Sequence, residues 1–161
     1  MRATLLLFCL LLPAAGPGRA ADCPGPGKPV ALKTVIRGVI GNLDKKSERV
    51  VRSEADWKAL WGQLGLPLKP SPTAPAIDFS TNMVLGVTAG EGRGVVEVEI
   101  VRVEQRAACL YVTVAERAVP KNMAADQFSK FHPFHFVRIP PAKDPVVFTY
   151  VKAALPRTAP K

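Results

Sequence analysis

Residues 74–100 constrain the fold more than any other part of this sequence. They comprise an apolar segment, a glycine-rich turn and a second segment in which apolar and acidic residues alternate. The turn contains Gly90, Gly92 and Gly94, and glycine readily adopts the positive φ angles of tight turns. Alternation with a period of two is typical of a strand that has one buried face. The pattern therefore predicts a β-hairpin at the centre of the domain.

The first twenty residues are typical of a secretory signal peptide. Arg2 is followed by an apolar run over residues 5–12, and small residues lie near Ala20, where cleavage is expected. The run is too short to cross a bilayer, which takes about 20 apolar residues. We therefore expect an exported protein, periplasmic or extracellular, with no stable membrane insertion; an N-terminal membrane anchor is the alternative. A lipid anchor on Cys23 is disfavoured, because Asp22 stands where a lipoprotein signal has a small residue.

The remaining chain is long enough for one domain with one core. We expect a flexible arm rich in proline and glycine over residues 21–31, an α+β domain over residues 32–152 and a basic tail over residues 153–161. Loss of Arg2 and Arg19 takes the formal net charge from +9 to +7. The basic residues are scattered and no aromatic residues interleave with them, so we expect no nucleic-acid partner. An acidic partner remains an alternative.

Two cysteines, Cys23 and Cys109, remain once Cys9 is removed with the signal peptide. An exported protein meets an oxidising compartment, in which a disulfide between them can form. Cys109 can equally be a buried free thiol. The sequence leaves both possibilities open.

Residues 53–64 are predicted to form the main helix. Ser53 can accept a hydrogen bond from the amide near Asp56, and Gly65 ends the pattern. Four apolar residues fall at helical spacing on one face, which predicts a core-facing stripe: Trp57, Leu60, Trp61 and Leu64.

The other apolar segments are predicted to be strands, over residues 32–40, 48–52, 83–88, 95–104, 109–116, 134–139 and 146–151. Residues 83–116 are expected to form a three-stranded antiparallel meander. The alternation changes phase near Val101, which predicts a β-bulge there. The predicted fold is therefore α+β, with a mostly antiparallel sheet packed against the helix, and with long loops over residues 66–75 and 118–131.

No combination of residues in the sequence indicates catalysis. His132 and His135 are three apart on an expected strand, so they point to opposite faces and are poorly placed to share a metal. Asp78 is expected to bond amides in its own turn. The acidic pair Glu97 and Glu99 fits a solvated strand face. We predict no catalytic residues, no metal and no cofactor.

Four segments resemble the C-terminal domain of the protease-complex subunit PrcB. They are VVRSEADWKALW (residues 50–61), IDFSTNMVLGV (residues 77–87), residues 90–100 and HPFHFVRIP (residues 132–140). The resemblance implies an exported bacterial protein of α+β type. The founding member of that family is a lipoprotein that associates with a secreted subtilisin-like protease and supports its stability. This chain departs from the family in having Gly94-Val95-Val96 where the family's turn has paired glycines and a tyrosine, and in lacking the lipoprotein signal.

We therefore expect a non-enzymatic exported accessory protein that binds another extracytoplasmic protein, such as a secreted subtilisin-like protease. Two alternatives stay open. One is a small protease inhibitor that presents a loop on a β scaffold, and the other is a hydrolase whose site, with Asp78, a histidine and a hydroxyl, forms only on folding. The contacts are expected to come from three loops: residues 90–94, residues 118–131 and the proline-rich loop over residues 66–75. The candidate contact residues are Gly90, Glu91, Gly92, Arg93, Gly94, Lys121 and Asn122.

Overall fold

The computed structural model describes residues 23–39, 41–66, 70, 72–91, 94–119 and 130–153. These residues form eight strands and one helix, so the strand-rich α+β class is confirmed. In chain order the elements are β1 (Lys28–Pro29), β2 (Lys33–Gly38), β3 (Ser47–Val51), α1 (Glu54–Leu64), β4 (Met83–Thr88), β5 (Val95–Gln105), β6 (Leu110–Ala118), β7 (Phe134–Ile139) and β8 (Val146–Lys152). The predicted signal peptide and all of the predicted tail beyond residue 153 lie outside the described residues.

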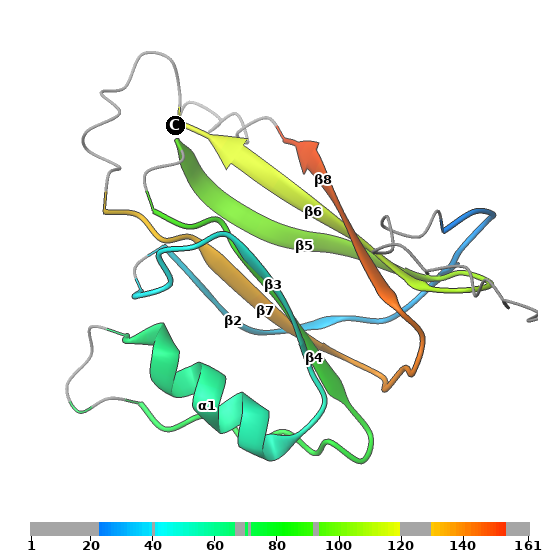
Figure 1. Ribbon diagram of the computed structural model, residues 1–161, viewed down its shortest axis with the longest axis horizontal. Coiled ribbons are helices and arrows are strands. Elements are labelled where there is room, and N and C mark those ends of the chain that lie inside the picture. Colours follow the sequence, from blue (N-terminus) through cyan, green and yellow to red (C-terminus); the bar gives the residue numbers. More distant parts are fainter. Residues whose placement is uncertain are drawn as a thin grey trace, which may run out of the picture.

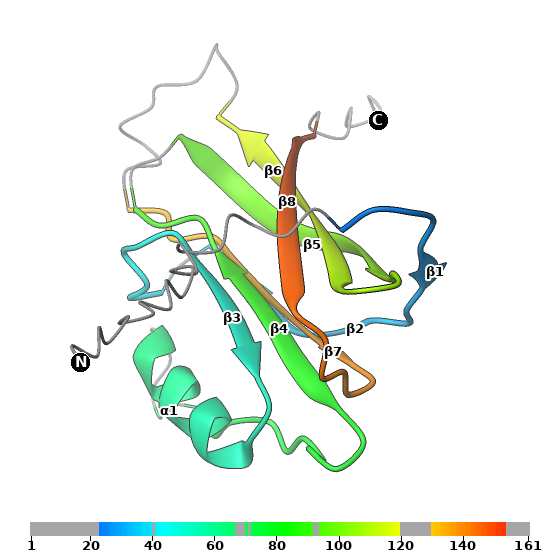
Figure 2. The same cartoon turned by 45° about the vertical axis from the view of Figure 1, so that its right-hand side comes forward.

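The strands form two four-stranded sheets rather than one. The first has the order β1-β5-β6-β8 and the second has the order β2-β7-β4-β3. All described pairings are antiparallel except that of β6 with β8, which is parallel. Figure 1 shows the two sheets stacked, with α1 against the outer face of the second sheet. The turned view of Figure 2 shows the same order of layers.

The predicted hairpin of β4 and β5 is wrong, and so is the three-stranded meander. β4 pairs with β3 and β7, whereas β5 pairs with β1 and β6. The glycine turn therefore carries the chain from one sheet to the other. Only the last part of the meander, the β5–β6 hairpin, is present.

The burial of β4 explains its central place. All six of its residues are buried. Leu85 and Val87 face the core between the two sheets, while Val84 faces α1 and packs in the second core with Trp57 and Phe136. A strand buried on both faces needs a neighbour on each side and a layer above and below, which a simple hairpin cannot supply.

The helix forms as the sequence predicts. The Ser53 side chain accepts a hydrogen bond from the backbone N–H of Asp56, and Gly65 ends the helix with φ of 54°. Trp57 is only 1% exposed and lies edge-on to Phe136. The indole of Trp57 also donates to the carbonyl of Pro75 at 3.0 Å, so the proline-rich loop is held against the helix.

A bulge divides β5 where the alternation changes phase. The register with β6 shifts between Ile100 and Arg102, which leaves Val101 unpaired and 46% exposed. The predicted bulge is therefore confirmed. A second shift lies between Val95 and Glu97.

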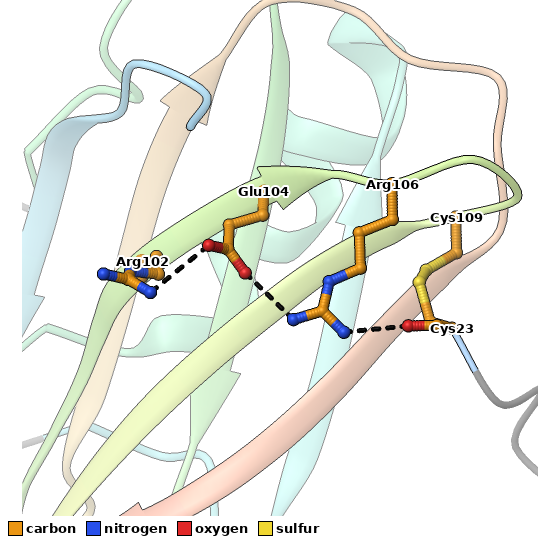
Figure 3. Close-up of polar contacts among 5 residues, drawn as sticks. All are labelled: Cys23, Arg102, Glu104, Arg106 and Cys109. Atoms are coloured by element: carbon orange, nitrogen blue, oxygen red, sulfur yellow. Dashed lines mark hydrogen bonds and ion pairs between the residues drawn. A yellow bond between two sulfur atoms is a disulfide. The ribbon is translucent and has the colours of Figure 1, made fainter. Parts of the chain in front are cut away.

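The N-terminal arm is attached to the first sheet. Cys23 forms a disulfide with Cys109, and β1 adds two residues to the edge of β5. Figure 3 shows Arg106 beside this disulfide, where its guanidinium donates to the carbonyl of Cys23 at 2.8 Å and pairs with Glu104 at 3.0 Å. A disulfide-bonded Cys23 has no thiol for a lipid anchor. Among the described residues, no helix is both long and apolar enough to cross a membrane.

Candidate functional site

Three chain segments meet at one end of the second sheet, on the left of Figure 1. Residues 41–46 lead into β3, residues 89–91 follow β4, and residues 130–133 lead into β7. We call these three segments the loop end. Because β3, β4 and β7 are neighbours in antiparallel order, their connections meet here although they lie far apart in the sequence.

Backbone hydrogen bonds join the three segments of the loop end. The N–H of Glu91 donates to the carbonyl of Asp44 at 3.0 Å, and the N–H of Ala89 donates to the carbonyl of Pro133 at 2.8 Å. The segment after β4 is therefore bonded to both of the others. Each of these bonds fixes the position of a loop relative to the sheet.

Gly90 can have no side chain. Its φ is +77°, and a Cβ atom placed there would lie 2.7 Å from the N of Lys46 and 2.9 Å from the O of Asp44. The glycine turn is also held at its other end, where the N–H of Val119 donates to the carbonyl of Gly94 at 2.8 Å. Gly90 and Gly94 thus have the positive φ that the sequence predicts. The turn that they form connects the two sheets, however, and does not close a hairpin.

The predicted contact residues are only partly described. Glu91 is exposed at the loop end, next to Gly90, and Gly94 is exposed at the start of β5. The remaining four lie outside the described residues: Gly92, Arg93, Lys121 and Asn122.

The loop end brings together one histidine and two carboxylates. Ligand atoms of Asp44, Glu91 and His132 all lie within 4.8 Å of one another. Nδ1 of His132 is 3.2 Å from a carboxylate oxygen of Asp44, and the histidine side chain is 13% exposed. The backbone N–H of His132 donates to the carbonyl of Val39 at 2.9 Å, which fixes the base of the side chain.

His135 lies apart from this cluster and belongs to the core. It is 1% exposed, and its Nδ1 accepts from the N–H of Ile100 at 2.9 Å. Since Nδ1 accepts, the proton is on Nε2, which lies 3.0 Å from the hydroxyl of Thr34. Burial lowers the pKa of His135, and Arg37 adds to this while Glu99 opposes it. His135 is therefore a neutral link between the two sheets.

Asp78 bonds its own turn, as predicted. Its carboxylate accepts from the N–H of Ser80 at 2.9 Å and from the hydroxyl of Thr81 at 2.8 Å. The hydrogen bonds from Ser80 and Thr81 lower the pKa of Asp78. Asp78 precedes β4 and His132 lies beyond the far end of β4, so the strand separates them by about 17 Å at 3.4 Å per residue. The described fold does not bring Asp78 and His132 together.

Glu97 and Glu99 take part in ion pairs on β5. Both carboxylates bind Arg117 of β6, and Glu99 also lies 3.8 Å from Arg37 of β2. The hydrogen bond that Arg117 donates to the carboxylate of Glu97 raises the pKa of Arg117. A hollow of about 320 Å³ lies beside them, and its lining holds no histidine, cysteine or hydroxyl side chain among the described residues.

Comparison of the chain with models of protein families, with curated proteins and with solved structures finds no match. The resemblance to the PrcB domain therefore stays a prediction. Sequence reasoning missed Asp44 as a neighbour of Glu91 and His132. No local pattern could have revealed it, because the three residues lie in separate connections that only the sheet order brings together.

Proposed function

We propose that this protein is an exported, non-enzymatic accessory protein whose loop end binds another extracytoplasmic protein. The partner class to test first is a secreted subtilisin-like protease, which this protein should stabilise. The proposal rests on the backbone hydrogen bonds that join the three segments of the loop end. Glu91 and Ala89, in the segment after β4, donate to the other two segments. A surface that is already ordered loses little conformational entropy on binding.

The chemistry of the described residues supports binding more than turnover. The Asp78 carboxylate is bonded within its own turn, and both ring nitrogens of His135 have partners in the core. Asp78 and His132 lie at opposite ends of β4. A nucleophile, a base and an orienting group within hydrogen-bond reach are what hydrolysis of the usual type needs.

A protease inhibitor is the second candidate. It is favoured by the attachment of the glycine turn at both ends, through Glu91 to Asp44 and through Gly94 to Val119. A loop held at both ends on a β scaffold can occupy a protease cleft without large loss of entropy. An inhibitor lowers the activity of its protease, whereas a stabiliser leaves activity intact and lengthens its lifetime.

The test is capture of partners from native periplasm or culture supernatant with two matched variants. Glu91→Lys reverses an exposed charge at the loop end, and Glu54→Lys reverses an exposed charge at the start of α1. We expect the wild type and Glu54→Lys to retain the same protein, and Glu91→Lys to lose it. Capture that is equal for both variants, or a reproducible failure to capture any protein, contradicts the proposal. Activity and half-life of a captured protease then separate stabiliser from inhibitor.

A further inference from the structure

We propose that Asp44, Glu91 and His132 form a binding site for a divalent transition-metal ion of the Zn²⁺ type. The site goes beyond protein binding and does not depend on it. Its ligands come from all three segments of the loop end. One imidazole nitrogen and two carboxylates suit Zn²⁺ and its neighbours better than Mg²⁺ or Ca²⁺, which prefer oxygen ligands alone.

The first observation is the state of the His132 ring nitrogen. Nδ1 is shielded from solvent and has no hydrogen-bond partner among the described residues. The oxygen of Asp44 is only 3.2 Å away, so it must lie off the direction that a ring N–H would need. A simple hydrogen-bonded ion pair places the oxygen on that line. The pair is therefore close but not arranged as donor and acceptor.

The same separation fits two ligands of one ion. Zn²⁺ binds nitrogen and carboxylate oxygen at about 2.0–2.2 Å, which places neighbouring ligand atoms about 3.0–3.5 Å apart for octahedral or tetrahedral angles. The ion then lies on the lone-pair axis of Nδ1, and the oxygen of Asp44 lies beside that axis. One carboxylate oxygen of Glu91 lies within 4.8 Å of the ligand atoms of Asp44 and His132, and rotation of this exposed side chain can shorten these distances.

The second observation is that, among the described residues, neither carboxylate forms an ion pair with a lysine or an arginine. Lys46 follows Asp44 in the same segment, but its ammonium lies 2.6 Å from Glu116 and over the ring of Tyr150. In the part of the chain that the structure describes, the ion pair of Asp44 is with His132, and Glu91 is exposed to solvent. A divalent cation balances both carboxylates and takes the free Nδ1 as a third ligand, with the fourth position left for water.

The backbone supports these three side chains. Gly90 lies in contact with the carbonyl of Asp44, and Glu91 donates its N–H to the same carbonyl. The two carboxylates therefore start from backbone positions that are fixed relative to each other. A bound ion ties the segment before β7 to this pair through His132.

The test uses Zn²⁺ titrated into the oxidised, untagged chain of residues 21–161, which contains every described element and lacks Cys9. Calorimetry is expected to give one site per chain near neutral pH. Asp44→Asn, Glu91→Gln and His132→Ala should each weaken binding about tenfold or more, as loss of even an outer-shell partner costs 10–100-fold. Glu54→Gln, an exposed carboxylate elsewhere, should bind like the wild type.

The two histidines provide a readout that does not depend on folding of the variants. In NMR spectra of the wild type, Zn²⁺ should shift the ring signals of His132 and leave those of the buried His135 unchanged. Absence of Zn²⁺ binding, binding that survives both Glu91→Gln and Asp44→Asn, or equal shifts of both histidines overturns the proposal.

Discussion

The disulfide between Cys23 and Cys109 should make a large contribution to stability. The perturbation is the double variant Cys23→Ala/Cys109→Ala, which leaves no free thiol in the chain of residues 21–161. The two cysteines are separated by 86 positions. Closure of a loop of that size lowers the entropy of the unfolded chain and contributes about 4.6 kcal/mol at 25 °C.

The expected loss is somewhat smaller than this figure. β1 has only two residues paired to β5, so without the disulfide the arm can detach from the folded protein and recover part of its entropy. We expect the free energy of unfolding to fall by about 3–4.6 kcal/mol, a large part of the roughly 5–15 kcal/mol typical of a domain. Such a loss lowers the urea midpoint strongly.

Urea unfolding followed by tryptophan fluorescence measures this effect, because Trp57 is 1% exposed in the folded protein. Reduction of the wild type should lower the midpoint by a similar amount, and the reductant should have no effect on the double variant. A change below about 1 kcal/mol on reduction would refute the reasoning, since the closed loop would then not constrain the unfolded chain.

Three further predictions concern single side chains. Burial lowers the pKa of His135 in the folded protein. The contribution of His135 to the stability of the fold is therefore complete above the pKa of histidine in the unfolded chain, about 6.5, and is lost as the pH falls below that value. The stability difference between wild type and His135→Gln should therefore narrow on acidification, as urea unfolding at several pH values can measure. Gly86→Ala places a Cβ atom 2.1 Å from the ring of Phe136. This clash should lower the free energy of unfolding, measured with urea, by about 1–3 kcal/mol. Ser53→Ala removes the N-terminal cap of α1 and should lower the free energy of unfolding by about 1 kcal/mol. Thermal unfolding measures this effect, and a midpoint equal to that of the wild type would contradict it.

Local features were predictable from the sequence. The helix begins at a capping serine, has its stripe at helical spacing and ends at Gly65, so all of its signals lie within thirteen residues. The bulge at Val101 is visible as a change of phase within one strand. The turn within residues 78–82 depends on the Asp78 side chain, which accepts from the backbone N–H two residues away.

Pairing across the sheets was not predictable in the same way. The glycine turn and the alternation after it predict a turn and a strand, but they do not say which strand lies alongside. The neighbours of β4 lie at residues 47–51 and 134–139, and long-range pairs of this kind leave no mark on either sequence. One signal was present: β4 is continuously apolar rather than alternating, which is typical of a central strand buried on both faces.

The candidate site depends on the same long-range pairing. Glu91 was predicted as a contact residue because it lies in the glycine turn. Asp44 lay in an ordinary polar turn, and His132 was considered only together with His135. Their meeting follows from the order β7-β4-β3, which places three connections at one end of the sheet.

Site-specific photo-crosslinking in the native compartment tests most directly whether the loop end binds another protein. The photoreactive residue replaces Glu91 in one variant and Glu54, an exposed residue at the start of α1, in the control. We expect a discrete adduct of higher mass from position 91 and none from position 54. No adduct from position 91, or the same adduct from both positions, would contradict it.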